Sequence, residues 1–185
     1  LHQRLRRQRQ MCIRDSFSPA NVMRLLEIVR GAKTSNETIA SSMKLGRTLN
    51  KIAVLSGNAP GFIGNRMLGG YTRQAGEIIL QGATPYQVDN ALLQFGMPMG
   101  PFQMNDLVGL DLGWRARKLS GMKPEDVPIT ARVADKLCEM DRYGQKTSRG
   151  FYIYLEGSRA GQPDPEVVSI VEETSAELGI ARREI

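Results

Sequence analysis

Two polar residues occupy positions where they could do chemistry. Glu27 lies between Leu26 and Ile28 in an apolar run, where a carboxylate is costly to bury unless it has a partner. Asn65 lies in the first turn of a helical stretch that follows a Pro-Gly turn. A carboxylate accepts hydrogen bonds and an amide can donate them, so either residue could act on a reacting group. The ordinary structural explanations are a solvated acid and a local hydrogen bond to the backbone, and both stay open at this level.

The helix that carries Asn65 is the first of three. Apolar residues recur at helical spacing over 62–81, and a glycine then stops the run. A Thr-Pro start and a glycine stop bound a second helix within 84–96. The string GMPMGPF forces the backbone through a turn, and a third helix is expected from about residue 101.

The first 16 residues differ in composition from the rest. They hold five arginines and one acid, and they show neither helical nor strand periodicity. A disordered basic arm and a tail that binds RNA or lipid both fit such a sequence. The string RRQRQMCIRDS resembles the in-frame translation of a common sequencing-library adapter, so we expect 1–16 to be a non-native arm. This arm contains His2, the only histidine.

The segment around Glu27 is ambiguous on its periodicity. The apolar spacing within 22–29 predicts an amphipathic helix. Ser35 with Thr38 predicts a capped helix, and 51–55 (KIAVL) predicts a short buried strand.

Further elements are expected beyond residue 111. The strings LGWRARKLSG and TARVADKLCEMDRYG predict two helices separated by a polar loop. GQKTSR predicts a loop, and 151–155 predicts a short aromatic strand. Residues 157–165 have the composition of a linker, and Asp164 is suited to cap a last helix.

Composition sets limits on the function. No apolar run approaches the roughly 20 residues of a membrane helix, so we expect no membrane span. Cys12 and Cys138 fit no metal-ligand pattern, so we expect no metal site. The net charge of +6 would suggest a nucleic-acid partner, but most of it lies in 1–16, and we expect no such partner for the rest.

Four strings in this order resemble the 3-hydroxyacyl-CoA dehydrogenase family: FSPANVMRLLEIV, PGFIGNR, FGMPMGPFQMNDLVGLD and RYGQKTSRGFYIY. Together they cover most of 17–154. The serine in FSPA and the tail from PDPEVV are similar to the multifunctional fatty-acid oxidation proteins. The resemblance implies a mainly α fold, a helical C-terminal dehydrogenase domain preceded by the trailing α/β edge of a Rossmann domain. It also implies that Phe17 ends one strand and that 25–29 forms the next.

The resemblance implies four parts of the chain. Residues 17–57 would be the C-terminal remnant of an NAD-binding domain, 58–156 the helical domain, and 157–185 a linker and the start of a second helical domain, all after the arm 1–16. No G-x-G-x-x-G string occurs, so the loop that cradles the phosphates of NAD is absent from this sequence. We therefore expect a fragment that is inactive alone.

The resemblance also assigns the site residues. The family oxidises an L-3-hydroxyacyl-CoA to a 3-oxoacyl-CoA with NAD, using a histidine base that a glutamate holds. Glu27 matches this catalytic glutamate, and Asn65 matches the asparagine that binds the substrate oxygen. Ser18 and Lys146 match cofactor-binding positions, although a small residue before a turn and a solvated loop lysine are ordinary explanations for them. Asp15 stands where the family has its histidine, and an aspartate is too weak a base to replace it.

Four further residues have two explanations each. Met97, Met99 and Met104 could line an acyl channel, but methionines at such positions more often fill a core. Arg66 could meet a phosphate of coenzyme A, but an arginine on a helix surface more often pairs with a nearby acid.

The sequence therefore predicts a fragment of an NAD-dependent oxidoreductase of fatty-acid β-oxidation. Its expected location is a bacterial cytoplasm or, in a eukaryote, a peroxisome or mitochondrion. Its expected partners are the acyl-CoA substrate and a second helical domain or another subunit. The alternative is a non-catalytic helical assembly module, which the missing histidine and the apolar helix faces would suit. A nucleic-acid binder would depend wholly on 1–16.

Overall fold

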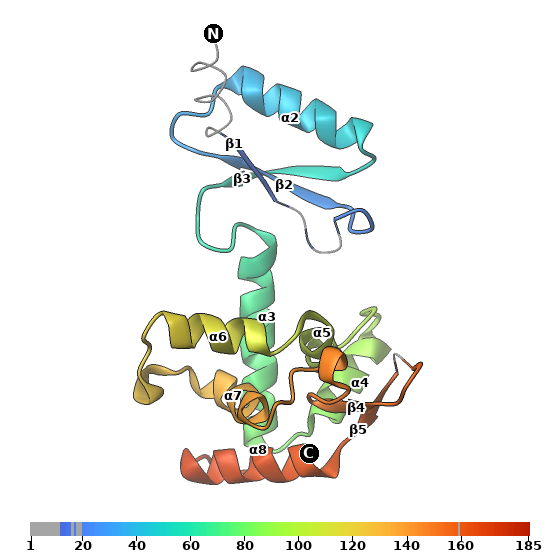
Figure 1. The fold of residues 1–185 in the computed structure, drawn as a ribbon, viewed down its shortest axis with the longest axis vertical. Helices are drawn as coiled ribbons and strands as arrows, with labels where there is room; N and C mark the ends of the chain where they lie inside the picture. The colour runs from blue at the N-terminus through green and yellow to red at the C-terminus, as the bar shows by residue number, and fades with distance from the viewer. Residues whose placement is uncertain (1–11, 16, 18–19, 159) are drawn as a thin grey trace. The chain divides into compact units, whose positions relative to one another are not determined.

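The computed structural model describes residues 12–15, 17, 20–158 and 160–185. The chain forms two compact units, Leu1–Gly69 and Gly70–Ile185, which we call unit 1 and unit 2 and describe separately (Figure 1). Helix α3 (Gly64–Gln81) begins in unit 1 and ends in unit 2. Among the described residues, no helix combines the length and the apolar character that crossing a membrane requires.

Unit 1 is a small α/β layer. Strands β1 (Cys12–Asp15), β2 (Leu25–Arg30) and β3 (Ile52–Gly57) form a sheet in the order β1-β2-β3. β1 runs antiparallel to β2, and β3 runs parallel to β2 through the crossover helix α2 (Asn36–Thr48). α2 lies over one face of this sheet (Figure 1). A parallel pair joined by a helix is the unit from which Rossmann domains are built.

The structure settles the ambiguity around Glu27 in favour of a strand. The helix that periodicity predicts over 22–29 is wrong, because this segment pairs on both sides with other strands. The strand implied by the family resemblance is confirmed as β2. Its antiparallel partner is β1, which lies inside the arm 1–16 and ends before Phe17, so the predicted end at Phe17 is wrong by two residues.

Strand β3 forms where KIAVL predicts it, but it is less buried than expected. Ile52 is 53% exposed and Leu55 is 44% exposed, although Ser56 is buried. The prediction of a buried strand is wrong here, because β3 is the last strand of its sheet and little in unit 1 covers these side chains. The predicted cap of α2 is confirmed, since the Ser35 side chain accepts a hydrogen bond from the Thr38 amide at 3.2 Å.

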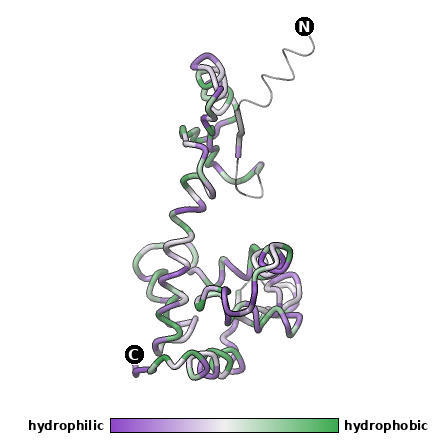
Figure 2. The backbone as a smooth tube through the Cα atoms, turned by 90° about the vertical axis from the view of Figure 1, so that its left-hand side faces the viewer, coloured by the Kyte–Doolittle hydropathy of each residue, from purple (hydrophilic) through white to green (hydrophobic). Residues whose placement is uncertain are grey.

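Unit 2 is helical, as predicted. After α3 the chain forms α4 (Pro85–Phe95), α5 (Pro101–Val108), α6 (Asp111–Leu119), the 3-10 turns η1 (Pro124–Asp126) and η2 (Ile129–Ala131), α7 (Arg132–Glu139), the 3-10 turn η3 (Gln145–Thr147), β4 (Tyr152–Tyr154), β5 (Gly161–Pro163) and α8 (Pro165–Glu177). Figure 2 shows hydrophobic residues recurring between hydrophilic ones along the turns of α3, as in an amphipathic helix.

Local sequence chemistry explains the ends of α4. The predicted Thr-Pro start is confirmed, and Thr84 and Gln87 form a reciprocal capping box there. The sequence analysis did not identify the contribution of Gln87. Gly96 closes the helix with φ 105°, a left-handed conformation that glycine adopts without strain. The predicted stop at Gly96 is thus confirmed.

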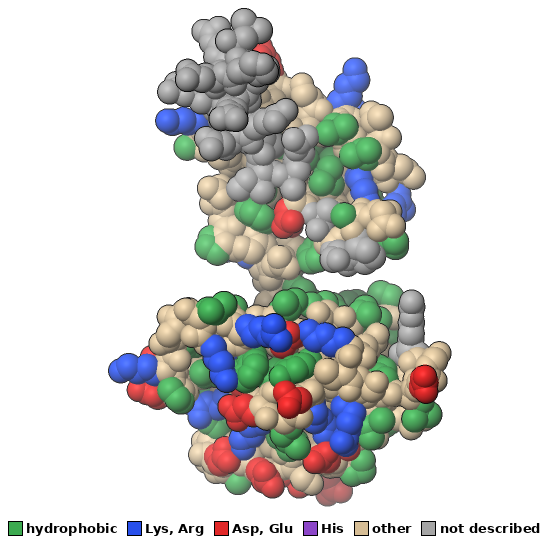
Figure 3. Space-filling view, in the orientation of Figure 1, with side chains coloured by type: hydrophobic (Ala, Val, Ile, Leu, Met, Phe, Trp, Pro, Cys, Tyr) green, Lys and Arg blue, Asp and Glu red, His purple; other side chains and the backbone are tan. Residues whose placement is uncertain are grey.

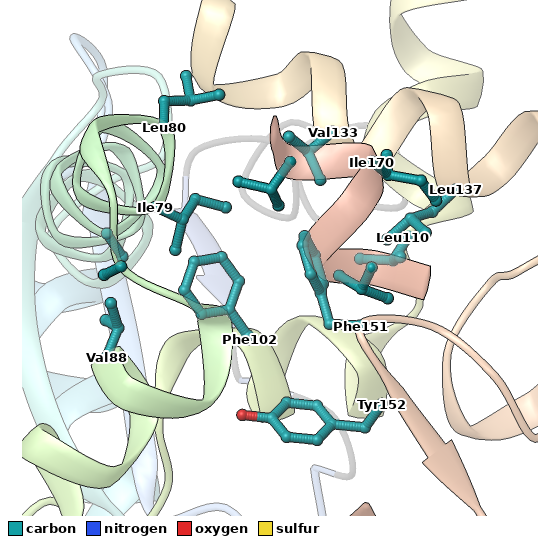
Figure 4. Close-up of a cluster of buried hydrophobic side chains, with 14 of the residues drawn as sticks. Ile79, Leu80, Val88, Phe102, Leu110, Val133, Leu137, Phe151, Tyr152 and Ile170 are labelled. Atoms are coloured by element: carbon teal, nitrogen blue, oxygen red, sulfur yellow. The ribbon is translucent and has the colours of Figure 1, made fainter. Parts of the chain in front are cut away.

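The hydrophobic core of unit 2 contains side chains from helices along the whole sequence of this unit (Figure 4). Phe102 of α5 and Phe151 pack with ring centroids 4.8 Å apart. α8, which follows the predicted linker, adds Val167, Ile170 and Val171 to the same core. The linker stretch itself contains β5, which pairs with β4.

Two buried carboxylates join these elements. Asp89 of α4 accepts hydrogen bonds from the first turn of α5 and from the Tyr152 hydroxyl at 2.8 Å. Asp106 of α5 accepts from the amides of Phe151 and Tyr152 at 2.9 and 3.0 Å and from the Tyr154 hydroxyl at 2.9 Å. Each carboxylate is 1% exposed, so these hydrogen bonds offset a large desolvation cost. They fasten β4 to α4 and α5.

Candidate functional site

The carboxylate of Glu27 binds the start of helix α3. Its Oε1 atom accepts hydrogen bonds from the backbone amides of Ile63 at 2.8 Å and Gly64 at 3.3 Å. The first turn of α3 contains no acidic residue, so Glu27 supplies from β2 the negative charge that a helix N-terminus favours. Glu27 is 3% exposed, and the solvated acid considered from sequence is therefore wrong.

The register of the sheet places residue 15 beside this carboxylate. Asp15 and Glu27 are Cα partners in the antiparallel pair of β1 and β2. Residues directly opposite in such a pair extend to the same face of the sheet with Cβ atoms about 5 Å apart. The position at which the resemblance expects a histidine is thus the one that faces Glu27.

Asn65 follows directly on the amides that Glu27 binds. It is exposed in the first turn of α3, one residue after Gly64. A β-carbon at Gly64 would come within 2.8 Å of two ring carbons of Phe17 and 3.5 Å of Glu27 Oε2. Gly64 therefore allows the aromatic ring and the carboxylate to approach the helix start together, one residue before Asn65.

The turn before α3 is conformationally strained. Gly61 has φ 75° and Phe62 has φ 46°, a left-handed conformation that is uncommon for a bulky residue. Strain of this kind persists where the surroundings hold it, and here the Glu27 carboxylate binds the backbone amide of Ile63, the next residue.

Ser18, the predicted nicotinamide neighbour, lies outside the described residues.

Lys146 belongs to unit 2 and has a separate environment. Its ammonium group donates to Oδ1 of Asp111 and lies 5.7 Å from the ring centroid of Tyr143. Arg115 pairs with the other oxygen of Asp111, with 3.3 Å between Nε and Oδ2. The Asp111 side chain is only 4% exposed, whereas Lys146 and Arg115 are 47% and 63% exposed.

The loop before Lys146 is tied to the start of α6. The amide of Leu110 donates to the Tyr143 carbonyl at 3.1 Å, and the amide of Tyr143 donates to the Thr147 hydroxyl at 2.8 Å. Gly109 has φ 103°, and a β-carbon there would lie 3.0 Å from the Lys146 ammonium and 2.9 Å from Asp111. Lys146 is therefore a held cation, not a freely solvated lysine.

The direction of the pKa shift of Asp111 agrees with its contacts to Lys146 and Arg115. The hydrogen bond from Lys146 is the largest influence on the pKa of Asp111, and together with Arg115 it lowers that pKa despite burial. Asp111 is ionised at neutral pH and holds a cation on each oxygen.

Asp111 is a residue that the sequence analysis did not single out. It is the first residue of α6, where an acid is favoured, and by sequence alone it looks like an ordinary helix-start carboxylate. The signal that could have found it is the i, i+4 pair with Arg115 beside the string GLD.

The remaining candidates are less enclosed. Met97 is 38% exposed, Met99 and Met104 are half-buried, and these three do not belong to the core cluster of the described residues. The interpretation of these methionines as core filler is therefore wrong. Arg66 is exposed, and none of the ion pairs among the described residues includes it.

The residues of this chain do not form the phosphate cradle of a dinucleotide. Nowhere among its 19 glycines do two stand two positions apart, as G-x-G requires. The β2-α2-β3 unit carries a Ser35 cap and no glycine loop at the start of its helix. Within the described part of the chain there is also no group of three or more His, Cys, Asp or Glu side chains that could hold a metal ion.

Comparisons with known proteins also divide the chain into two parts. Residues 1–59 match the family described as 3-hydroxyacyl-CoA dehydrogenase, NAD binding domain, and 61–154 match 3-hydroxyacyl-CoA dehydrogenase, C-terminal domain. The peroxisomal bifunctional enzyme of Danio rerio is 45% identical in an alignment of 181 positions that covers 91% of this chain and 25% of that protein. The Homo sapiens enzyme of the same name is 45% identical in an alignment of 161 positions, which covers 80% of this chain and 22% of that protein.

Solved structures give the same result. The 3-hydroxybutyryl-CoA dehydrogenase of Escherichia coli is 30% identical with a TM-score of 0.67, over 83% of this chain and 32% of that one. The dehydrogenase part of multifunctional enzyme 1 from C. elegans is 28% identical with a TM-score of 0.63, and the match covers 88% of this chain and 37% of that one. The chain spans about a quarter of the length of the curated relatives that it matches. The chain belongs to the 3-hydroxyacyl-CoA dehydrogenase family.

Proposed function

We propose that this chain is part of an enzyme that oxidises L-3-hydroxyacyl-CoA to 3-oxoacyl-CoA with NAD in fatty-acid β-oxidation. The observation that carries the proposal is the buried Glu27 carboxylate, which binds the start of α3 and faces residue 15 across the sheet. A carboxylate held in this way can orient an imidazole base, as in other acid–base sites.

The residues of unit 1 would divide the work on the substrate. A histidine at position 15 would take the proton of the 3-hydroxyl group, and Glu27 would hold that histidine and stabilise its protonated form. Asn65, exposed beside the bound amides, would donate a hydrogen bond to the same substrate oxygen. The hydride that leaves the same carbon would go to a cofactor whose phosphate loop this chain does not contain. Lys146 and Ser18 would be cofactor-binding residues, with Ser18 near the nicotinamide.

The names of the relatives favour one compartment. Several are called peroxisomal, and one from Brassica napus is called glyoxysomal. We therefore assign the protein to a peroxisome in preference to a bacterial cytoplasm.

Unit 2 would pack against a second helical domain or another subunit. Large apolar side chains on α4, α5 and α6 are unusually exposed, including Phe95 at 83%, Val108 at 60% and Leu119 at 89%. Because contiguous exposed apolar side chains mark surfaces that a partner covers, we expect these helices to contribute to such a surface.

The test is turnover by the full-length protein with histidine at position 15. With acetoacetyl-CoA and NADH, we expect its NADH absorbance to fall, whereas the 185-residue chain should remain at background. The matched control is full-length protein with Asp at position 15, which separates an enzyme from an assembly module. No turnover by full-length protein with histidine at that position would refute the proposed function and leave the assembly module.

A further inference from the structure

The glycine at the first position of helix α3 is not explained by helix formation. Glycine is a poor helix former, and alanine at the same position would favour the helix. The backbone of Gly64 is helical, a conformation that L-residues adopt without strain, so a positive φ is not the reason either. Space is the remaining explanation. A β-carbon at Gly64 would lie 2.8 Å from two ring carbons of Phe17, closer than real β-carbons approach other atoms.

A second glycine in α3 shows that this contact belongs to the helix start. A β-carbon at Gly70 would have none of the described atoms within 4 Å. Gly64 and Gly70 share the same low helix propensity and differ in their surroundings. Alanine at position 64 must therefore displace the Phe17 ring, whereas alanine at position 70 has room.

The Phe17 ring reaches a point beside the buried carboxylate of Glu27. The ring carbons Cε2 and Cζ and the Oε2 atom of Glu27 all lie within 3.5 Å of the place that a β-carbon of residue 64 would occupy. The hydrogen bonds from the amides of Ile63 and Gly64 both end on the other oxygen, Oε1. The ring is therefore close to the oxygen that these two amides do not use.

Position 15 faces the same carboxylate. Strands β1 and β2 pair Asp15 with Glu27, and Phe17 follows position 15 by two residues. A base at position 15 and the Phe17 ring thus approach Glu27 from one segment of the chain. A half-buried aromatic ring at this point keeps water away from the contact between base and carboxylate, and a charge interaction is stronger where water is excluded.

An apolar side chain in unit 1 does not by itself indicate a function. Figure 3 shows hydrophobic side chains scattered over the surface of this unit, as on most proteins. Phe17 differs because the helix that it approaches has no side chain at the position where one would collide with the ring. The inference therefore depends on Phe17 and Gly64 together.

We propose that Gly64 and Phe17 are positioning residues for a base at position 15. The missing side chain at Gly64 lets the Phe17 ring shield the Oε2 atom of Glu27 from water, so the carboxylate acts more strongly on an imidazole at position 15. This inference rests on the proposed function, in which position 15 holds a histidine. Neither Gly64 nor Phe17 takes part in the proton transfer itself.

The first measurement is the pKa of the imidazole in the 185-residue chain with Asp15→His, by NMR titration. Glu27→Gln lowers that pKa, and the size of the fall measures the interaction between the two side chains. In a chain that also carries Phe17→Leu, we expect the fall to shrink to about half, because water then screens the contact. Gly64→Ala should shrink it similarly by displacing the ring, and Gly70→Ala should leave it unchanged.

The second measurement is turnover of acetoacetyl-CoA by the full-length protein with histidine at position 15. We expect Phe17→Leu and Gly64→Ala each to lower kcat about tenfold while KM stays within about twofold, because the base is held less well and the substrate contacts are unaltered. The double variant should lose no more than Gly64→Ala alone, since both changes remove the same contact. Gly70→Ala is the matched control and should keep kcat within about twofold.

Several outcomes would overturn the proposal. They are an effect of Glu27→Gln on the imidazole pKa that is the same with and without Phe17→Leu, a rise in KM with unchanged kcat, and an equal loss in Gly70→Ala. The NMR spectrum of each variant checks that unit 1 is folded. If Gly64→Ala fails to fold, Phe17→Leu decides, because a smaller side chain at position 17 introduces no collision.

The two measurements separate this inference from the proposed function. Turnover by the full-length protein, together with an interaction between Glu27 and the imidazole that does not respond to Phe17→Leu, would reject this inference alone. A response of that interaction with no turnover by the full-length protein would reject the proposed function alone.

Discussion

Replacing Glu27 by alanine should release the start of helix α3. The change removes the acceptor of two backbone hydrogen bonds, from Ile63 at 2.8 Å and Gly64 at 3.3 Å. A hydrogen bond to a charged group contributes about 1.5–3 kcal/mol, and the longer of the two is expected to be weak. We therefore expect the opening free energy of these two amides to fall by about 2–3 kcal/mol, which is about 30- to 150-fold faster exchange.

Glu27→Gln separates the hydrogen bond from the charge. Glutamine retains one carbonyl acceptor, so it should lose mainly the attraction between the carboxylate and the helix N-terminus, about 1 kcal/mol or about fivefold in exchange rate. The assay is NMR-detected amide hydrogen exchange on the 185-residue chain at constant pH. Glu37→Ala is the control, because Glu37 carries the same charge but lies exposed in the first turn of α2.

The result that would refute this reasoning is specific. If Glu27→Ala leaves exchange at Ile63 and Gly64 within about twofold of the unaltered chain, the carboxylate does not hold the helix start. An equal acceleration in Glu37→Ala would show a general loss of stability in unit 1 instead of a local contact.

Three further predictions concern titration and burial. In an Asp15→His variant, we expect the pKa of the introduced imidazole to fall by about 1 unit or more when Glu27→Gln is added, because the opposite carboxylate no longer favours the cation; NMR titration with no difference would contradict the register. Arg142→Met should cost unit 2 about 3 kcal/mol in urea unfolding followed by Trp114 fluorescence, because it strips Asp164 of a buried partner at 2.7 Å; a loss below about 1 kcal/mol would contradict it. Burial raises the pKa of Asp106 to about 6 against the hydrogen bonds that lower it. The folded state therefore holds this proton more tightly than the unfolded chain, so the unfolding free energy of the unaltered protein should rise relative to Asp106→Asn as the pH falls from about 7 to about 5, and a flat difference would contradict it.

Local signals explain why most of unit 2 was predictable from sequence. Caps and stops such as Thr84 and Gly96 act through their own backbone, so their effect does not depend on distant residues. The same holds for the Ser35 cap of α2. In unit 1, family resemblance was needed to predict strand β2, because periodicity predicted a helix there.

Pairing between distant strands was harder to predict. Strand β1 lies in a stretch with no strand periodicity, and only its register with β2 makes it a strand. The exposure of Ile52 likewise depends on β3 being last in its sheet, which the sequence of β3 does not encode. Such features arise from tertiary contacts that a local pattern cannot report.

The buried carboxylates left a faint signal that the sequence analysis did not use. Asp106 stands four residues after Phe102, on the same face of α5, so an apolar face contains an acid that needs donors. The string YIY of β4 supplies one of those donors, because Tyr152 and Tyr154 extend to one side and a buried tyrosine hydroxyl needs a partner. Neither segment identifies the other from sequence alone. Glu27 differs, because its apolar neighbours already indicated that it required a partner.

The central claim is that Glu27 supports the base of a 3-hydroxyacyl-CoA dehydrogenase. The most direct measurement is the turnover of acetoacetyl-CoA by full-length protein with histidine at position 15, compared with the same protein carrying Glu27→Gln. We predict that turnover falls by about 10³-fold or more while the variant stays folded, because the imidazole loses the anion that orients it. Glu37→Gln should stay within about twofold as the matched surface control. Full activity in the Glu27→Gln protein would contradict the claim and leave Glu27 as a structural cap of α3.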